Sequence, residues 1–338
     1  MKNILVTGGL GFIGSHTVVE LHHRGYNPII VDNLSNSQEE VLNRLKKITG
    51  TQFTFLNIDL VDFDKTRQIF SDQIIDGVIH FAAYKAVGES VEKPLDYYEN
   101  NLGSLINLLK LSQEFRVSNF IFSSSCTVYG QPDRLPVDES FPKLPAESPY
   151  GKTKQVCEEI IEDYCKSNPD FKAISLRYFN PTGAHESALI GELPLGIPNN
   201  LVPFITQTAA GIREKLNVFG GDYNTPDGTC IRDYIHVVDL ANAHIAALEH
   251  AEKMDTNYDM FNVGTGKGNS VLEVIQSFEK VTGISLNYEI VDRRPGDIEK
   301  IYADTKKVNS ILGWKAERDL DNMMKTAWEW QKSLSIKE

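Results

Sequence analysis

The stretch NILVTGGLGFIG, residues 3–14, begins with a short apolar run and continues into evenly spaced glycines. Gly8, Gly11 and Gly14 have the spacing G-x-x-G-x-x-G, which lets the chain turn tightly, lets bare backbone approach a pyrophosphate and lets the next helix sit close to the sheet. The N–H groups at the start of that helix would face the phosphates. The pattern alone is weak, because ordinary turns before helices also contain glycine, so its context decides the interpretation.

A second apolar run that ends in an acidic residue provides that context. Residues 28–31 predict a strand, and Asp32 follows close to the ~20 residues after the glycines at which a carboxylate binds both hydroxyls of an adenosine ribose. The same carboxylate would repel the 2′-phosphate of NADP, and residues 33–37 contain no arginine. The sequence therefore predicts a dinucleotide site that binds NAD rather than NADP.

The composition is that of an ordinary soluble globular protein. The chain has 338 residues, of which 41% are hydrophobic and 24% charged, so we expect one large domain or two closely packed domains. A net charge of -12 argues against binding of nucleic acid, because phosphate backbones recruit an excess of Lys and Arg. The opening apolar run is too short for a signal peptide, and no later run approaches the ~20 residues of a membrane span. We expect a cytoplasmic protein that contacts neither nucleic acid nor membrane.

The four cysteines indicate no metal site and no disulfide framework. Cys126, Cys157, Cys165 and Cys230 form no C-x-x-C pair and lie in apolar or helical stretches. We expect buried, reduced thiols and no bound metal.

The first half of the chain alternates short apolar runs with amphipathic segments, which is the pattern of a parallel sheet covered by helices. Residues 53–59 and 76–83 predict further strands, and the second is apolar enough to be buried on both faces. His80 in that strand is expected to be a core histidine rather than a ligand. Lys85 follows its carboxyl end, the edge where open α/β sheets bind ligands, and is therefore a candidate cofactor contact.

A long helix is predicted over residues 94–116, with apolar side chains on more than one face. One face can pack on the sheet and the other on a partner subunit. We therefore expect a homodimer with an isologous contact of the helices around residues 94–116 and 152–167. For Asn100 and Asn101 within the first helix, simple exposure and contact with the cofactor stay equally open.

The residues that carry chemistry come after an apolar strand at 120–125 that ends in three serines. Ser148 can cap a helix and Pro149 suits its first position, which places Tyr150 in the first turn and Lys154 on the same face. An ammonium group and the positive end of a helix both favour the phenolate, so Tyr150 can act as a general base. Although a Y-x-x-x-K pair is often a surface pair of little energy, its position after a nucleotide fold favours catalysis.

These motifs resemble the extended short-chain dehydrogenase/reductase superfamily and, within it, the UDP-glucose 4-epimerase family. The resemblance starts from residues 7–14, 123–130 and 150–154 and continues, in the order of the family, through 80–90, 176–181, 196–201, 227–229, 231–237 and 293–297. It departs from the family at Ala83 and Tyr84, where Gly-Leu is common, at residues 102–105, where a Gly-Thr pair is usual, and at Pro295, where Glu is frequent. None of these departures removes a group that the mechanism requires.

The resemblance implies the residues that surround NAD and those that contact a UDP-sugar substrate. Around NAD it places Gly8, Gly11, Phe12, Ile13, Gly14, Asp32, Asn33, Asn36, Ser37, Asp59, Leu60, Phe81, Lys85, Asn100, Tyr150, Lys154 and Phe179. Against the UDP-sugar it places Ser125, Tyr150, Asn180, Asn200, Leu201, Asn217, Phe219, Arg232, Arg294, Asp297 and Ile301. For Arg232 and Arg294 the chemistry of the side chain indicates the same role, because a pyrophosphate in an acidic protein needs planar, multiply donating cations.

The activity implied by the resemblance is the interconversion of UDP-glucose and UDP-galactose, a step of galactose metabolism. Tyr150, assisted by Lys154, would take the proton of the sugar 4-hydroxyl while C4 gives its hydride to NAD⁺, and Ser125 would hydrogen-bond the reacting oxygen. The 4-keto sugar then turns over while its nucleotide stays anchored, and the hydride returns to the other face. Net redox is zero, so NAD is retained.

Three other activities share parts of these motifs. A sugar-nucleotide 4,6-dehydratase shares the fold and the Tyr-Lys pair but carries acidic residues directly after the strand hydroxyl, where this chain has Cys126 and Thr127. A decarboxylase or a uronate 4-epimerase stays open within the superfamily. An NAD-sensing regulator would keep the glycine turn without the pair of Tyr150 and Lys154, and ranks last.

The predicted fold is an α/β, Rossmann-type, doubly wound parallel sheet in residues 1–180, followed by a smaller, loop-rich substrate lobe in residues 181–338. Within the second part we expect a helix near 238–251, strands at 260–263 and 288–291, and an amphipathic helix from Asp319. Part of this lobe can return to the first domain, and the active site should lie between the two.

Ile301 falls where epimerases carry either a small side chain or a tyrosine. A small residue there leaves room for an N-acetyl group, whereas a β-branched isoleucine cannot swing aside easily. We therefore expect a preference for UDP-glucose and UDP-galactose over their N-acetyl counterparts.

Overall fold

The computed structural model describes residues 1–294 and 297–335. In this part of the chain, seven parallel strands form a central sheet in the order β3-β2-β1-β4-β5-β6-β10. The strands are β1 (Asn3–Thr7), β2 (Asn27–Asp32), β3 (Thr54–Asn57), β4 (Gly77–His80), β5 (Asn119–Ser125), β6 (Lys172–Tyr178) and β10 (Tyr258–Val263). The order reverses between β1 and β4, and this reversal opens a crevice at the carboxyl ends of the strands. The predicted doubly wound α/β fold is confirmed.

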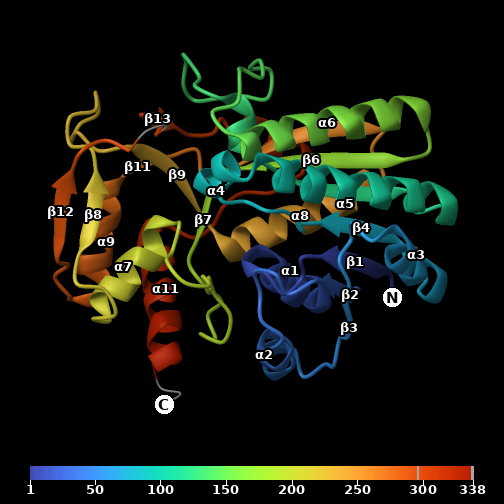
Figure 1. Cartoon of the computed structure of the whole chain (residues 1–338), viewed down its shortest axis with the longest axis horizontal. Helices are drawn as coiled ribbons and strands as arrows, with labels where there is room; N and C mark the ends of the chain where they lie inside the picture. Colours follow the sequence, from blue (N-terminus) through green and yellow to red (C-terminus); the bar gives the residue numbers. More distant parts are fainter. Residues whose placement is uncertain (295–296, 336–338) are drawn as a thin grey trace.

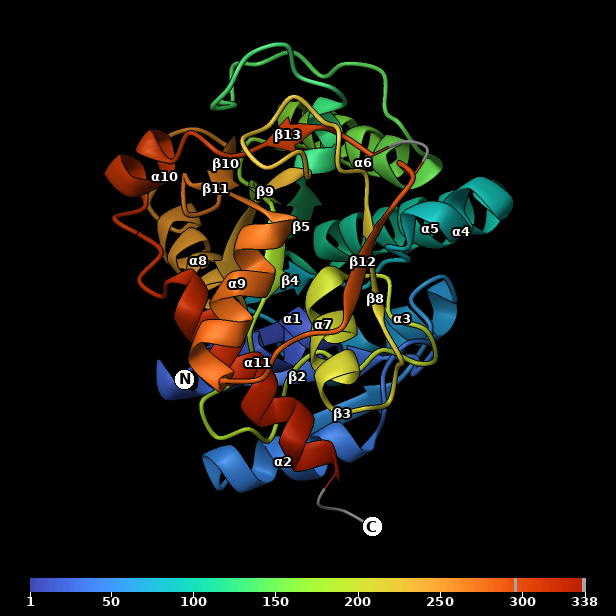
Figure 2. The same cartoon turned by 90° about the vertical axis from the view of Figure 1, so that its left-hand side faces the viewer.

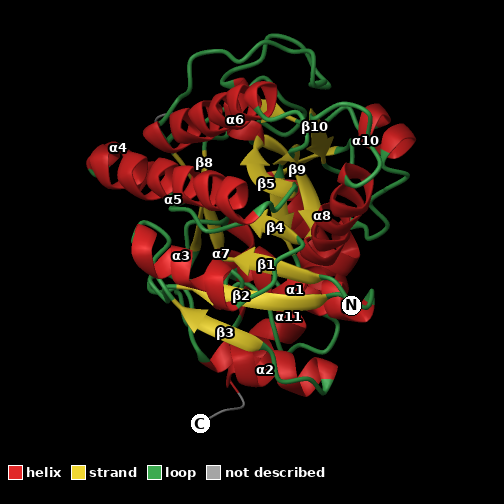
Figure 3. Cartoon of the chain, turned by 90° about the vertical axis from the view of Figure 1, so that its right-hand side faces the viewer, coloured by secondary structure: helices red, strands yellow, loops and turns green. Residues whose placement is uncertain are grey.

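Helices cover both faces of this sheet, as Figures 1 and 3 show. One face carries α1 (Phe12–His23), α2 (Glu40–Thr49) and α8 (Val237–Ala251). The other face carries α3 (Phe63–Asp72), α5 (Pro94–Phe115) and α6 (Pro149–Ser167). The strands are apolar on both sides because both sides are covered.

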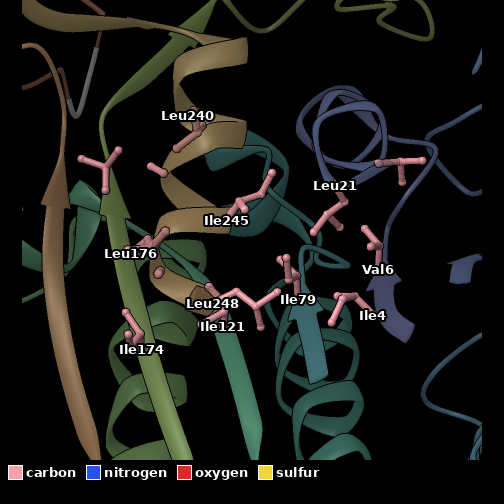
Figure 4. Packing of buried hydrophobic residues seen from close by; sticks show 14 of the residues in the cluster. Ile4, Val6, Leu21, Ile79, Ile121, Ile174, Leu176, Leu240, Ile245 and Leu248 are labelled. Carbon is pink, nitrogen blue, oxygen red and sulfur yellow. The ribbon is translucent and has the colours of Figure 1, made fainter. Parts of the chain in front are cut away.

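The alternation of side chains along each strand divides the core into two layers. In β1, Ile4 and Val6 join the layer under α1 and α8, whereas Leu5 joins the opposite layer. Figure 4 shows the first layer, in which Leu21 of α1 and Leu248 of α8 pack against strand residues. Full burial of one such side chain stabilises the fold by roughly 1.5–3 kcal/mol.

The second half of the chain builds a smaller layer beside the sheet, which faces the viewer in Figure 2. Its described residues form a four-stranded sheet and a two-stranded sheet. The four strands are β7 (Asn180–Thr182), β9 (Ile231–His236), β11 (Gly268–Ser270) and β13 (Lys300–Ile301), and the two are β8 (Leu216–Phe219) and β12 (Tyr288–Val291). The helices of this half, apart from α8, are α7 (Leu201–Ala209), α9 (Val271–Thr282), α10 (Lys306–Ile311) and α11 (Leu320–Ser335).

Two elements of the second half return to the first. Helix α8 packs on α1, and β10 extends the central sheet beyond β6. The remaining elements are a short helix α4 (Val87–Glu92) and a 3-10 turn η1 (Cys126–Tyr129). No helix within residues 1–294 and 297–335 combines the length and the apolar character needed to cross a bilayer.

Several local predictions can be compared with the structure. His80 is a core histidine, 2% exposed, whose Nδ1 lies 2.7 Å from Thr7 Oγ1. The strands predicted at 53–59 and 76–83 are shorter, because their last residues leave the ladder as loops. The expectation of buried cysteines is wrong for Cys126, which is partly exposed at the start of η1; the other three are buried.

A buried ion pair ties α6 to the sheet. Arg177 donates from Nη2 and Nε to the two carboxylate oxygens of Glu158, at 2.7 and 2.9 Å, and both side chains are 2% exposed or less. Burial alone would raise the pKa of Glu158, but Arg177, helped by Lys143, lowers that pKa below its usual value. This stabilisation is therefore present above the unfolded-state pKa of the carboxyl and is lost as pH falls through the folded-state pKa.

Replacement of Arg177 by methionine should lower the free energy of unfolding by about 3–5 kcal/mol, because it leaves a buried carboxylate without its main partner. Denaturant unfolding at pH 7 measures this. Lys166→Met on the same helix is the matched control: it removes two exposed pairs, Lys166 Nζ to Glu162 Oε1 at 3.1 Å and to Asp163 Oδ1 at 3.2 Å, and should leave the unfolding midpoint unchanged. Equal midpoints for the two variants would contradict the prediction.

Candidate active site

A cavity of about 230 Å³ opens where the strand order reverses, at the carboxyl ends of β1, β2 and β4. Among the residues predicted to surround NAD, all except Phe179 line it. They come from the glycine turn, the ends of β2 and β3, the loop after β4, and helices α5 and α6. The cavity therefore collects residues that are far apart in the sequence at one edge of the sheet.

The glycine turn brings three segments of backbone into contact. Gly8 has a φ of +65°, and a Cβ there would lie 2.9 Å from the backbone nitrogen of Ala82. A Cβ on Gly14 would overlap the carbonyl oxygen of Gly8. Only glycine allows this approach, which leaves the first N–H groups of α1 facing the cavity.

Two carboxylates at the ends of neighbouring strands are held in fixed positions. Asp32, 8% exposed, accepts hydrogen bonds from Leu10 N at 3.1 Å, Leu34 N at 3.0 Å and Ser37 Oγ at 2.8 Å. Asp59 accepts from the side chain of Asn33 at 3.2 Å, among others. Both can therefore receive donors of a ligand without reorganisation.

Tyr150 and Lys154 lie where the helix start places them. Ser148 caps α6 by accepting a hydrogen bond from Gly151 N at 3.1 Å, and Tyr150 in the first turn is 7% exposed. The ammonium group of Lys154 donates to the carbonyl of Ser123 at 2.7 Å and lies 5.9 Å from the centre of the Tyr150 ring.

The electrostatics of this pair differ from the prediction. Burial raises the pKa of Tyr150 well above its usual value, and the Ser125 side chain, which interacts with the phenol, opposes the shift only in part. Burial also lowers the pKa of Lys154 to about 8, while Cys157 and Glu158 act in the opposite direction. The expected lowering of the Tyr150 pKa is therefore wrong for the protein without ligands, because loss of water outweighs the nearby charge.

A buried asparagine is connected through hydrogen bonds to the helical turn that carries Tyr150. Asn101, 3% exposed, accepts from Tyr84 N at 2.8 Å and donates to Thr153 Oγ1 at 3.0 Å; Thr153 in turn donates to the Tyr150 carbonyl at 2.7 Å. Asn100 lines the cavity and donates to Asn101. Asn101 thus has a structural role that neither exposure nor cofactor contact anticipated.

The residues predicted to contact the UDP-sugar are more scattered. Tyr150 and Asn200 line the cavity, whereas the other side chains in this group do not: Ser125, Asn180, Leu201, Asn217, Phe219, Arg232, Arg294, Asp297 and Ile301. Ser125 interacts with Tyr150, Asn180 starts β7 and Leu201 starts α7.

The two arginines and Ile301 belong to the smaller layer. Arg294 pairs with Asp297 at 2.7 Å and lies 5.4 Å over the ring of Phe219. Arg232 stands beside Ile301 in the ladder of β9 and β13. Ile301, 2% exposed, packs in one cluster with Phe179. Pro295 and Gly296 of the same motif lie outside the described residues.

One wall of the cavity is formed by residues that no motif in the sequence indicates. The loop between β7 and α7 contributes its residues 189–195 to this wall. Arg44 of α2 and Trp330 of α11 also line the cavity and contact this loop. The loop is rich in Gly and Pro, which indicates a surface connection but not what it covers.

Comparison with known proteins agrees with this geometry. Over residues 5–327 the chain matches the family described as GDP-mannose 4,6 dehydratase. It is 51% identical to a UDP-glucose 4-epimerase of Bacillus subtilis (strain 168), over 98% of this chain and 97% of the relative.

Two solved structures have the same fold over 98% or more of their length. One is UDP-glucose-4-epimerase from Stenotrophomonas maltophila with bound NAD and formylated UDP-arabinopyranose, with a TM-score of 0.97, 46% identity and coverage of 100% of both chains. The other is UDP-glucose 4-epimerase from Bifidobacterium longum in complex with NAD⁺ and UDP, with a TM-score of 0.94, 47% identity and coverage of 98% of each chain. Because about half of the residues are identical over nearly the whole chain and the folds coincide, this chain belongs to the UDP-glucose 4-epimerase family of the extended short-chain dehydrogenase/reductases.

Proposed function

We propose that this protein interconverts UDP-glucose and UDP-galactose by reversible oxidation at C4 of the sugar, with NAD as a retained cofactor. The observation that carries the proposal is the position of Tyr150 and Lys154 on one face of α6, against the serine end of β5 and at the wall of the dinucleotide cavity. The protein is thus an NAD-dependent isomerase.

The residues of the cavity fit NAD. The close backbone approach at Gly8 leaves space for a pyrophosphate, and the fixed carboxylate of Asp32 matches the hydroxyls of an adenosine ribose. The same carboxylate disfavours the phosphate of NADP. Bound NAD supplies the acceptor and donor of the hydride.

Tyr150 handles the proton. With its raised pKa the phenol stays protonated in the free protein, so abstraction of the sugar proton needs positive charge nearby. Lys154 provides such a charge, because a pKa of about 8 leaves its ammonium group largely protonated at neutral pH. Ser125, which interacts with the phenol, would hydrogen-bond the reacting oxygen during both oxidation and reduction of the sugar.

The smaller layer is proposed to bind the UDP part of the substrate. Arg232 and Arg294 supply planar cations for a pyrophosphate in an otherwise acidic chain. Residues 1–180 then form the NAD-binding domain and residues 181–338 the substrate lobe, from which α8 and β10 return to the first domain.

A 4,6-dehydratase is the second candidate, because the matching family carries that description. Dehydration at C5 and C6 needs acidic residues directly after the strand serine, and this chain has Cys126 and Thr127 in those positions. A decarboxylase or a uronate 4-epimerase would act on a sugar acid, and the relatives near 50% identity are named for UDP-glucose.

The purified protein, incubated with UDP-galactose, should form UDP-glucose without added NAD, as followed by NMR. Tyr150→Phe should lose about 10²- to 10⁴-fold in turnover while still binding the UDP-sugar, because general-base catalysis contributes about that much. Tyr164→Phe, a tyrosine of the same helix that packs on Phe171, is the control and should keep full activity. A 4-keto-6-deoxy product would favour the dehydratase, and Tyr150→Phe within a fewfold of wild type would remove Tyr150 from its role.

Substrate breadth should depend on Ile301. Ile301 is β-branched and buried beside Phe179, so we expect that it cannot swing aside for an N-acetyl group. The value of kcat/KM for UDP-galactose should then exceed that for UDP-N-acetylgalactosamine by roughly several-fold to hundreds-fold. Ile301→Ser should raise the value for the acetylated sugar, whereas Ile290→Ser on exposed β12 should not. Equal values in the wild type would contradict the prediction.

A homodimer in the cytoplasm completes the proposal. Val87, Val91 and Leu95, on α4 and at the start of α5, are 50%, 62% and 78% exposed, so an apolar surface adjoins the predicted interface. Light scattering should give twice the chain mass of 37.9 kDa, and Leu95→Glu should shift the mass toward one chain. A single-chain mass across a wide range of concentrations would refute the dimer.

A further inference from the structure

The loop between β7 and α7 crosses the dinucleotide cavity between two helices that are far apart in the sequence. Figure 1 shows this yellow-green loop between α2 and α11, and Figure 2 shows the end of α11 close to α2. We call residues 189–192 the strap. All four of its residues line the cavity, together with Asp32 and the glycine turn.

Trp330 of α11 fixes one end of the strap. Its ring is 5% exposed, and its Nε1 donates to the carbonyl of Glu192 at 2.9 Å. The indole packs so closely on Gly191 that a Cβ there would lie 2.5 Å from the ring. A hydrogen bond and a flat contact thus determine the position of Gly191 and Glu192.

Arg44 of α2 holds the other end. Its Nη1 donates to the carbonyl of Leu189 at 3.3 Å, and its guanidinium carbon lies 5.0 Å over the ring of Trp330. Arg44 and Trp330 therefore form one unit, in which the cation and the ring each contact the strap and each other.

Among residues 1–294 and 297–335, Arg44 forms no salt bridge. The side chain is 8% exposed and lines the cavity, yet no carboxylate of the described residues lies within 4.0 Å of it. Lys85, by contrast, pairs with Glu192 at 3.6 Å. A buried cation without an ion pair among these residues favours the arrival of an anion, and a dinucleotide carries negative phosphates.

We propose that Arg44 and Trp330 are positioning residues for the cofactor: they hold the strap across the cavity, and Arg44 attracts the phosphates, so that together they set how slowly NAD leaves. The inference rests on the proposed function only in requiring that the cavity bind NAD. It adds two residues and a means of cofactor retention to that site.

Cofactor release tests the inference without any sugar. The protein is loaded with NADH, chased with excess NAD⁺, and followed by the loss of bound NADH fluorescence. Arg44→Met and Trp330→Leu should each speed release by at least about tenfold, since each loses a contact of the strap. Trp330→Phe, which keeps a ring but removes the N–H donor, should give an intermediate rate.

The dependence of the NADH release rate on salt distinguishes the attraction of the phosphates by Arg44 from a general loosening of the strap. Release from the wild type should accelerate with ionic strength, Arg44→Met should lose most of this dependence, and Trp330→Leu should keep it. Because the two side chains act as one unit, the double variant should release NADH more slowly than the product of the two single effects predicts.

Matched controls lie on the same scaffold. Trp328→Leu changes a tryptophan of α11 that packs on Phe278, and Arg213→Met removes a guanidinium that lies 4.5 Å over the ring of Phe204. Neither residue lines the cavity, so both variants should release NADH at the wild-type rate. Melting curves verify that each variant is folded, and Arg44→Met keeps the test decisive if Trp330→Leu does not fold.

Release at the wild-type rate from folded Arg44→Met and Trp330→Phe would overturn the inference, as would equal acceleration in the controls. A wild type that binds no NADH would overturn it together with the proposed cofactor. A wild type that binds NADH but does not convert UDP-galactose would contradict the proposed function alone and leave the strap result valid.

Discussion

Three backbone segments meet at the carboxyl end of β1 with no space for a side chain between them. Gly8 approaches the backbone after β4, and Gly14 in the first turn of α1 rests on Gly8. This contact sets the distance between helix and sheet, and with it the depth of the crevice in which a pyrophosphate can lie. Helix α8 packs against α1, so the position of α8 over the sheet depends on the same contact.

The run of serines at the end of β5 connects the fold to the chemistry. The carbonyl of Ser123 accepts from Lys154, the hydroxyl of Ser124 donates to Glu158 at 2.6 Å, and the side chain of Ser125 interacts with Tyr150. These three partners follow one another at helical spacing on one face of α6. The same interface therefore positions the proposed reacting groups and buries the ion pair with Arg177, so stability and the geometry of the proposed site depend on the same contacts.

The charges of this acidic chain are arranged to suit anionic ligands locally. Lys85, Lys154 and Arg44 line the cavity, and each is held by a carbonyl or a carboxylate of the protein. Burial lowers the pKa of Lys154 to about 8 and raises the pKa of the Tyr150 phenol well above its usual value. The site thus combines cations that suit a dinucleotide with a phenol whose proton is strongly held.

The sequence by itself determined the features that act over a few residues. The glycine spacing, the acid at the end of β2 and the cap that places Tyr150 in the first turn of α6 are dictated by local backbone geometry, which a sequence displays directly. Only the tertiary structure decided that Asn101 supports the Tyr150 turn, that Arg44 and Trp330 meet across the strap, and that burial reverses the expected shift of the Tyr150 pKa. Those outcomes depend on which distant segments pack together and on how much water they exclude, and neither quantity is written in the spacing of residues along the chain.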